Sequence, residues 1–387
     1  MREIMNYDDI RPYEDHEVNH YINVLLKDDV FQQVLYFIFQ DEKKVKGVCQ
    51  LLSEIRSINE LQMKFMYPLI KEWIIDKTTS GITWSGLDNL DKTKSYLFIS
   101  NHRDIILDSA ILNYIIVNAG MNTTEIAIGN NLLIYDWILH AVKLNRAFVV
   151  KRNLPARELL LASKNLSSYI RKTITKDNMS VWIAQREGRT KDGFDQTQQA
   201  LLKMLNLSNK SDFESGFREL QIVPLSISYE REPCGISKVE EIYKREHDGF
   251  VKTQEDDLKS MAFGLTRPKG RVHFAFGKPI DAQLKKFGQA ENLAESIQQL
   301  ADHIDTCIYR NYKLWPNNYL AADLLTDSNL HADKVDDAVR DKFSELLDDL
   351  VKTIGEGDAN CQKRLFMQMY ANPLLNAEKV EGSEILS

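Results

Sequence analysis

The feature that most constrains this chain is an alternation of short apolar stretches with longer segments of helical periodicity, from about residue 95 to residue 282. The short stretches are rich in β-branched and aromatic residues, which is typical of buried strands. They are 96-YLFIS-100, 126-IAIG-129, 147-AFVV-150, 180-SVWIA-184, 221-QIVPLSI-227 and 271-RVHFAFG-277. The helical segments include 105–117, 131–143, 154–172, 194–206 and 251–264. This alternation predicts an α/β fold with a mixed, largely parallel sheet flanked by helices.

The two ends of the chain have helical periodicity and lack strand-like stretches. We therefore expect a helical N-terminal region over 1–76, a central domain over 77–282 and a helical C-terminal region over 283–387. The charged stretch 230–250 is interpreted as a surface excursion. The amphipathic segment 61-LQMKFMYPLIKEWII-75 is interpreted as a core-facing helix, with a membrane-surface helix as the alternative.

Composition excludes several classes of protein. The net charge of −7 lacks the basic excess that phosphate neutralisation requires, so no nucleic-acid partner is expected. No apolar run reaches the roughly 18–20 residues needed to span a bilayer, and the polar N-terminus does not resemble a secretory signal. The cysteines are scattered without a CxxC pair, which indicates neither a zinc site nor a disulfide framework and fits free thiols in the cytoplasm. They are Cys49, Cys234, Cys307 and Cys361.

The stretch 100-SNHRDIILDSAIL-112 is the first candidate site. His102 lies where a predicted strand ends and a helix begins, at the edge of an α/β sheet where ligands bind. Arg103, Asp104 and Asp108 follow it closely. A histidine held by a carboxylate can take a proton from a hydroxyl. Because no serine or cysteine nucleophile signature is near, that hydroxyl would belong to a substrate. The alternative is a polar loop with a helix cap.

The second candidate site is 183-IAQREGRTKDG-193, which also follows a predicted strand. It contains Glu187, Gly188, Arg189 and Lys191. A glycine allows close approach of the backbone to a ligand, and an arginine can hold a phosphate through two parallel hydrogen bonds. A solvated turn is the alternative interpretation.

Two further strand ends carry polar or special residues. Lys151 and Arg152 follow the strand 147–150, and two cations there suit an anionic substrate. Pro224 begins an apolar strand, where its missing N–H does least harm, and it is expected to be structural or to form a pocket wall. Because these residues would meet at one edge of one sheet, the sequence predicts a single site.

In this order the stretches resemble the four blocks of the glycerolipid acyltransferase superfamily, which includes lysophosphatidic acid and glycerol-3-phosphate acyltransferases. The family's NHxSxxD, GxIFIDR, EGTRS and proline-led strand appear as 101-NHRDIILD-108, 146-RAFVVKR-152, 187-EGRT-190 and 222-IVPLSI-227. The resemblance covers about residues 80–282 and suggests a longer bacterial subgroup with the glycerolphosphate acyltransferase fold. In this chain the aspartate stands six residues after the histidine instead of five, and the third block is one residue shorter.

The resemblance implies a role for each matching residue. His102 would be the general base and Asp108 would orient it, with Asp104 as the alternative partner. The cations would hold an acidic head group, and Glu187 would bond a glycerol hydroxyl or fix an arginine. Residues implied to bind substrate are Arg103, Lys151, Arg152, Glu187, Gly188, Arg189 and Lys191, with Pro224 as pocket wall.

The resemblance also implies transfer of a fatty acyl group from acyl-CoA or acyl carrier protein to a lipid or glycerol-phosphate acceptor in phospholipid synthesis. The acceptor expected first is 1-acylglycerol-3-phosphate. The alternatives are an acylated amino acid lipid as acceptor, or a non-catalytic lipid-binding relative. No cofactor or metal is expected, and the protein is expected to be cytoplasmic and peripheral on the inner face of the membrane. A metal hydrolase built on His102 with both aspartates is a weaker alternative, because no second histidine lies at ligand spacing.

Overall fold

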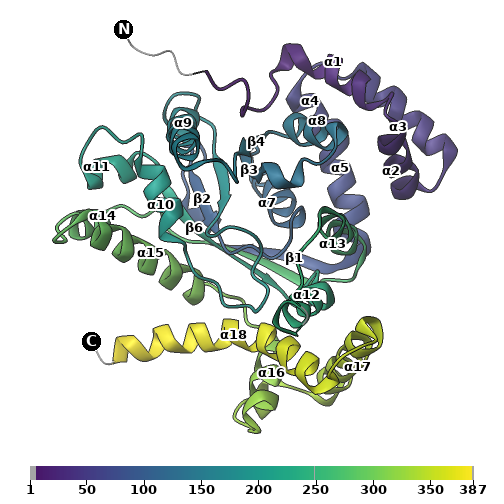
Figure 1. Cartoon of the computed structure of the whole chain (residues 1–387), viewed down its shortest axis with the longest axis vertical. Coiled ribbons are helices and arrows are strands. Elements are labelled where there is room, and N and C mark those ends of the chain that lie inside the picture. Colours follow the sequence, from purple (N-terminus) through teal and green to yellow (C-terminus); the bar gives the residue numbers. More distant parts are fainter. Residues whose placement is uncertain (1–5, 248, 386–387) are drawn as a thin grey trace.

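A central sheet of seven strands organises the molecule (Figure 1). The computed structural model describes residues 6–247 and 249–385. The strand order is β1-β7-β6-β2-β5-β3-β4, and every neighbouring pair is parallel except the antiparallel pair of β6 and β7. The predicted mixed, largely parallel sheet flanked by helices is therefore confirmed. The strands are β1 Thr79–Ser85, β2 Leu97–Ser100, β3 Glu125–Gly129, β4 Ala147–Val150, β5 Val181–Ala184, β6 Ile222–Tyr229 and β7 Gly270–Phe276.

Strand β1 is the one element of the sheet that the apolar pattern did not predict. It pairs only with β7, at the edge of the sheet, and most of its residues are exposed. A strand of this kind does not need the continuous apolar run that marks a buried central strand. Its partner β7 was predicted from its apolar run, and the last three residues of that strand, Phe274, Ala275 and Phe276, are buried.

Helices cover both faces of the sheet. One face packs against α7 and the end of a helical run over residues 58–78, and the other packs against the helices α9, α10, α11, α14 and α15. Their bounds are α7 Leu107–Asn118, α9 Ala156–Thr175, α10 Gln199–Asn206, α11 Phe213–Arg218, α14 Ala282–Phe287 and α15 Leu293–Arg310. The run over 58–78 comprises α4 Ile58–Leu61, η1 Gln62–Met66, α5 Tyr67–Leu69, η2 Ile70–Ile75 and α6 Asp76–Thr78. Three single-turn 3₁₀ helices, η3 Leu87–Asn89, η4 Asn130–Leu132 and η5 Ala332–Lys334, complete the described short elements.

The predicted N-terminal region forms a cap of helices beside the sheet (Figure 1, purple). Its helices pack with α8 around a separate apolar cluster. They are α1 Asp15–Leu25, α2 Asp29–Phe39 and α3 Glu42–Glu54, and α8 is Asp136–Leu144. The end of this region also contacts the main core, because Ile70 and Ile74 pack with residues of the sheet.

The amphipathic segment 61–75 lies within the molecule's packing. Its residues Leu61, Ile70 and Ile74 are buried in two apolar clusters. Phe65 and Trp73 are half-buried and pack against the same clusters. A core-facing helix therefore accounts for most of the apolar stripe. No helix within the described ranges combines the length and the apolar character needed to cross a bilayer.

The C-terminal region begins as part of the main core and then forms its own cluster. Helix α15 packs on the sheet, so the predicted boundary near residue 283 does not separate two cores. The remaining helices pack around a second centre together with α12. These are α12 Gly235–His247, α16 Pro316–Thr326, α17 Asp337–Ile354 and α18 Ala359–Ile385. Helix α13 Gln254–Thr266 lies elsewhere, because its Leu265 packs against the sheet cluster that includes α7.

The stretch 230–250, expected to be a surface excursion, instead contains the helix α12. Val239 of α12 is completely buried, and Lys238 and Glu241 are also buried. Helix α12 contacts α18, and the sequence around residues 230–250 does not indicate that contact. The charged composition was misleading because three of its charged side chains, Glu232, Lys238 and Glu241, form ion pairs inside the protein.

Candidate active site

His102 and Asp108 form a hydrogen-bonded pair where β2 gives way to α7. The distance between His102 Nδ1 and Asp108 Oδ2 is 2.8 Å. Asp108 is completely buried and accepts further bonds from the backbone N–H groups of Arg103, at 2.6 Å, and Asp104, at 3.1 Å. The hydroxyl of Tyr229, at the end of β6, donates to Oδ1 at 2.9 Å. The carboxylate is therefore held from several sides and fixes the orientation of the imidazole.

The structure explains how a six-residue spacing still brings the two side chains together. Asp104 accepts hydrogen bonds from the N–H groups of Ile106 and Leu107, each at 2.9 Å, and so caps the start of α7. This turn accommodates the additional residue. Asp104 is thus occupied at the helix start, and Asp108 on the first turn of α7 reaches the ring.

The remaining ring nitrogen of His102, Nε2, has no protein hydrogen-bond partner among the described residues. His102 lines a cavity of about 1220 Å³. Trp182 meets the imidazole edge to face, with ring centroids 5.4 Å apart, which further restricts its movement. Nε2 is therefore the atom through which this pair could exchange a proton with a bound molecule.

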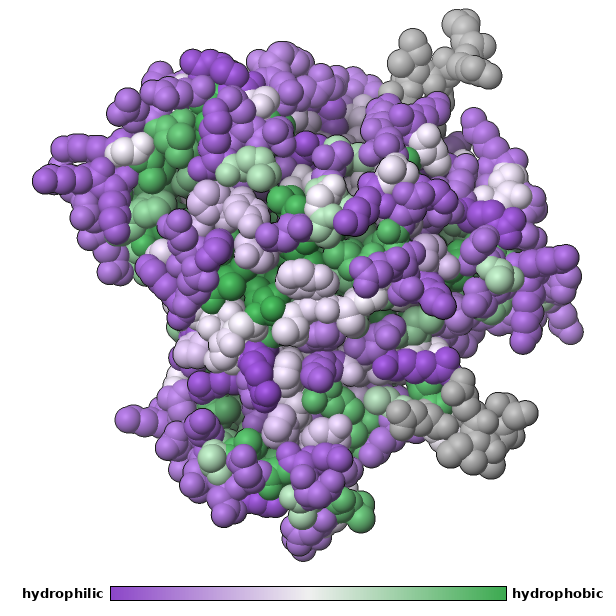
Figure 2. Space-filling view, turned by 180° about the vertical axis from the view of Figure 1, so that it is seen from behind, coloured by the Kyte–Doolittle hydropathy of each residue, from purple (hydrophilic) through white to green (hydrophobic). Residues whose placement is uncertain are grey.

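The cavity has an extended apolar part beneath the N-terminal helices. Residues from α1, α2, the 58–78 run and α8 line it, including Ile22, Leu35, Phe65, Trp73, Trp137 and Ala141. The volume and the apolar lining suit a long hydrocarbon chain. Figure 2 shows the face opposite to that of Figure 1, where apolar residues form patches within a mostly hydrophilic surface.

Several of the expected anion-binding cations line the same cavity but already have carboxylate partners. Arg152 forms an ion pair with Glu187 at 2.9 Å. Lys191 pairs with the buried carboxylate of Glu241 on α12, and burial lowers the pKa of Lys191.

Lys151 also lines the cavity and pairs with Asp9. Each of these three cations would have to release its carboxylate partner before all of its N–H donors could bind a substrate anion.

Arg189 differs from these cations. It lines the cavity and is only 8% exposed, yet its Nη1 has no hydrogen-bond partner. No carboxylate in the described ranges forms an ion pair with it. Gly188, directly before it, has a φ of +71° and open space where a Cβ would stand. A buried guanidinium beside open backbone is suited to an anionic group of a ligand.

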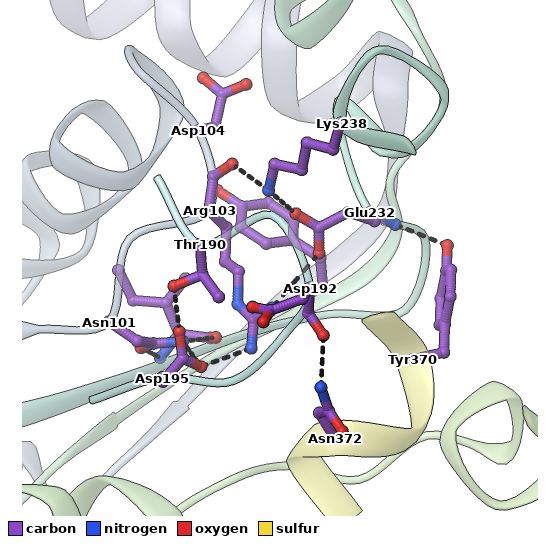
Figure 3. A network of polar contacts seen from close by, with 12 residues as sticks. Asn101, Arg103, Asp104, Thr190, Asp192, Asp195, Glu232, Lys238, Tyr370 and Asn372 are labelled. Carbon is purple, nitrogen blue, oxygen red and sulfur yellow. Dashed lines mark hydrogen bonds and ion pairs between the residues drawn. The ribbon is translucent and has the colours of Figure 1, made fainter. Parts of the chain in front are cut away.

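Arg103 lies beneath the site and does not line the cavity. Its guanidinium donates to Asp195 at 2.6 Å and lies 3.8 Å from Glu232 (Figure 3). Figure 3 shows Asp104 pointing away from this network. Lys238 donates to the carbonyl oxygen of Arg103 at 2.9 Å. The Arg103 guanidinium therefore faces partners inside the protein and does not make the expected contact with the substrate cavity.

Asp195 joins the two candidate loops. Its carboxylate accepts hydrogen bonds from Asn101 and Arg103 of the first loop and from Thr190 of the second. The loops also contact directly, because the Thr190 N–H donates to the carbonyl of His102 at 2.9 Å. This network fixes the second loop relative to the histidine.

The C-terminal region supports the same loops from outside. The Tyr312 hydroxyl donates to the carboxylate of Asp195. On α18, the Asn372 side chain donates to the carbonyl of Asp192 at 2.7 Å, and the Tyr370 hydroxyl accepts from the Glu232 N–H at 2.9 Å (Figure 3). The helices that follow the central domain are thus part of the framework of the site.

Pro224 is buried in the middle of the sheet and does not line the cavity. It pairs in register with Ile99 of β2, and its carbonyl accepts from the Gly277 N–H at 2.8 Å. Of the two roles expected for it, the structural one matches this position. Among the residues that the structure describes, no group of three or more histidine, cysteine, aspartate or glutamate side chains could hold a metal ion.

Three residues of the site were not singled out from the sequence. Tyr229 and Asp195 are far from His102 in the sequence and are brought to the site by the fold. No motif in the sequence around either residue indicates a role in the site. Arg186 lines the cavity directly before the EGRT stretch, and its position after a predicted strand could have identified it.

Two comparisons with known proteins found a match. A family model described as Acyltransferase matches residues 81–228, which contain His102, Asp108, Arg189 and most of the sheet. Among solved structures, the chain is similar to the 1-acyl-sn-glycerophosphate (LPA) acyltransferase PlsC from Thermotoga maritima. The identity is 13%, with 74% of this chain and 92% of that chain covered, at a TM-score of 0.36. No curated protein matches the sequence.

A mixed sheet with a histidine–aspartate pair at the carboxyl end of a strand, within residues that match this family model, defines an acyltransferase domain. The part of the chain shown to match the Acyltransferase family is therefore the domain over residues 81–228. This match supports a general acyltransferase role for the domain, which requires an acyl donor and an acceptor.

Proposed function

We propose that the protein transfers a fatty acyl group from an acyl thioester to a hydroxyl of a glycerol-phosphate-type lipid, with 1-acylglycerol-3-phosphate as the acceptor that fits best. One observation carries the proposal. The His102–Asp108 pair opens on a cavity that has an apolar part and, near the pair, a buried unpaired arginine, Arg189. These parts match an acyl chain, a reacting hydroxyl and an anionic head group.

In the proposed reaction His102 is the general base and Asp108 its orienting partner. Nε2 of His102 takes the proton of the acceptor hydroxyl while the hydroxyl oxygen attacks the thioester carbonyl carbon. The new carbon–oxygen bond forms, the carbon–sulfur bond breaks, and the leaving thiolate takes the proton from the imidazolium. No acyl-enzyme is required. Asp108 stabilises the imidazolium through its bond to Nδ1.

Arg189 is proposed to bind the acceptor's phosphate and thereby hold its hydroxyl near the carbonyl. Fixing a reacting group in this way supplies much of the advantage of catalysis. The Arg152–Glu187 pair and Lys191 border the same cavity and are proposed to contact the head group or the donor. The donor is proposed to be acyl-CoA or acyl carrier protein, with no further cofactor.

The first test is acyl transfer by the purified full chain and by His102→Ala and Asp108→Asn. We expect His102→Ala to lower kcat by about 10²–10⁴-fold, the usual contribution of a general base. His16→Ala is the matched control, because His16 is largely exposed on α1. Equal transfer by the His102 variant and the parent would overturn the catalytic role and favour a non-catalytic lipid-binding relative.

The acceptor and the donor are tested by offering them separately. The acceptors are 1-acylglycerol-3-phosphate, glycerol 3-phosphate and an N-acyl amino acid lipid with a free hydroxyl, each with acyl-CoA and with acyl carrier protein. We expect the highest kcat/KM with 1-acylglycerol-3-phosphate. A higher kcat/KM with the amino acid lipid would overturn the proposed glycerol-phosphate acceptor, whereas the proposed role of His102 would remain. Mass spectrometry of lipids from cells with and without the chain would identify the product.

We also propose that the protein works as a peripheral protein on the inner face of the membrane, since an acceptor that carries an acyl chain resides in a bilayer. Helix α2 supports this, because Val30, Tyr36 and Phe37 are about half exposed on its surface. The segment 61–75, for which a membrane-surface helix was the alternative interpretation, is less suitable, since its Phe65 and Trp73 are half-buried and line the cavity.

A further inference from the structure

Arg186 is a second arginine of the cavity wall without a carboxylate partner. It stands two residues beyond the end of β5 and lines the same cavity as His102. Its Nε is shielded from solvent and makes no hydrogen bond with the protein. Within residues 6–247 and 249–385, no acidic side chain forms an ion pair with it. Its closeness to EGRT in sequence places it on the loop that also carries Arg189.

The other arginines of the cavity wall are paired. Arg152 contacts Glu187 at 2.9 Å, and Arg245 contacts Glu241 at 2.8 Å. Glu187 offsets the charge of Arg152, whereas Glu241 is shared by Arg245, Lys191 and Lys252. Arg186 and Arg189 are therefore the two arginines of this wall that have no carboxylate partner within the described chain.

A shielded guanidinium nitrogen that lacks a partner is costly unless a ligand supplies an acceptor. Guanidinium groups match the oxygens of phosphate through paired hydrogen bonds. A phosphate monoester carries a charge of about −1.5 to −2 near neutral pH, whereas a carboxylate carries one negative charge. Two unpaired arginines on one loop thus match the charge of a phosphate monoester better than that of a carboxylate.

We propose that Arg186 is a further binding residue for the acceptor's anionic group, and that with Arg189 it selects a phosphate monoester over a carboxylate. This inference rests on the proposed function and names the chemistry of its acceptor. Arg186 contributes charge and hydrogen bonds to the head group and takes no part in proton transfer. Its loss therefore affects the KM for the acceptor more than kcat.

The test compares Arg186→Gln and Arg186→Lys with the parent on three acceptors that share one acyl chain. These are 1-acylglycerol-3-phosphate, an N-acyl serine and an uncharged monoacylglycerol. For Arg186→Gln we expect the KM for the phosphate acceptor to rise by about tenfold to hundredfold, the usual effect of losing hydrogen bonds to a charged group. The KM for the uncharged acceptor and for acyl-CoA should stay within about twofold.

Arg186→Lys is expected to be intermediate, because it keeps the charge but loses the planar pair of donors. Arg157→Gln, at an exposed position of α9 outside the cavity lining, is the matched control. An equal rise in KM for all three acceptors, a rise for acyl-CoA alone, or an effect no larger than that of Arg157→Gln would overturn the inference.

A binding measurement separates this inference from the proposed function. Thermal unfolding of the parent is followed with sn-glycerol 3-phosphate and with glycerol, since a ligand that binds the folded state raises Tm. We expect a rise with the phosphate only, and loss of that rise in Arg186→Gln. If the parent transfers no acyl group, the proposed function fails, while the Tm shift still decides on the anion site. A shift retained by Arg186→Gln overturns the site.

Discussion

The guanidinium of Arg103 donates to the buried carboxylate of Asp195, with 2.6 Å between Nη2 and Oδ2. This bond links the residue directly after His102 to the loop that follows EGRT. Because Asp195 also accepts from Thr190 and Tyr312, a single carboxylate connects two loops of the site and the C-terminal helices. The position of His102 relative to Arg186 and Arg189 therefore depends on contacts beneath the cavity.

Asp195→Asn is expected to loosen this arrangement. Breaking a buried ion pair by removing one charge costs about 3–5 kcal/mol of unfolding free energy. At a temperature where the variant is folded, we expect kcat/KM to fall by about tenfold to hundredfold, because the loops lose their relative placement. Urea unfolding and steady-state kinetics measure the two effects.

The matched control is Asp323→Asn, which changes a buried aspartate outside the cavity lining. This control should lose stability with little change in kcat/KM. If Asp195→Asn behaves in the same way, the network contributes to folding alone.

Tyr229→Phe removes one hydrogen bond to Asp108. Burial, followed by the neighbouring Asp108, raises the pKa of Tyr229 well above its usual range, so its hydroxyl remains a donor. Loss of one such bond is worth about 1 kcal/mol or somewhat more, and we expect kcat to fall by roughly fivefold to tenfold. Tyr243→Phe is the control, because that hydroxyl bonds the Asp358 backbone outside the site. Equal kcat values for the Tyr229 variant and the parent would contradict an orienting role.

Much of the central fold was predictable because buried parallel strands leave continuous apolar runs in the sequence. The loop after the strand that ends at Ser100 could also be located from its polar residues. The choice between Asp104 and Asp108 was harder, since both lie within reach in sequence. Only the helix cap made by Asp104 determines which carboxylate is left for the ring.

The contacts made over long separations were not predictable. Asp195 meets Arg103 across 92 positions, and Tyr229 meets Asp108 across 121. No local pattern of spacing or periodicity encodes such pairs. The same holds for Arg103. The family resemblance implied a substrate contact for it, but its partners Asp195 and Glu232 lie inside the protein.

Asp305 is expected to make stability depend on pH. Burial raises its pKa from 3.8 to about 7, against the lowering effect of hydrogen bonds from Thr197. Between about pH 4 and pH 7 the folded state therefore holds more protons than the unfolded state, and the stability decreases as pH rises through this window. Above pH 7 the contribution levels off.

Asp305→Asn removes this titration. We expect its unfolding free energy, measured in urea, to change less than that of the parent between pH 5 and pH 7. Relative to the parent, the variant should gain stability as pH rises. Parallel curves for the two proteins would show that Asp305 does not titrate in this range.

The apolar part of the cavity is expected to set the preferred acyl chain length. Ala141→Phe would shorten it, and Trp137→Ala would enlarge it, because both residues line it. Each methylene that no longer fits forfeits about 0.8 kcal/mol, or roughly fourfold in kcat/KM. We expect opposite shifts in a series of acyl-CoA donors of increasing length. Ala282→Phe, at an exposed position on α14, is the control. An unchanged preference for acyl chain length in both cavity variants would contradict the assignment of this part of the cavity to the acyl chain.

The last prediction concerns the membrane contact proposed for α2. Val30 and Phe37 are 47% and 51% exposed, so replacing them with serine removes apolar surface without opening the core. Because apolar insertion drives the attachment of an interfacial helix, we expect the double variant to pellet less with liposomes. Its Tm should remain close to that of the parent. Leu330→Ser is the matched control, since Leu330 is 80% exposed in the C-terminal region. Equal pelleting of parent and double variant would place the membrane contact elsewhere, whereas a loss shared with Leu330→Ser would indicate a general effect of surface polarity.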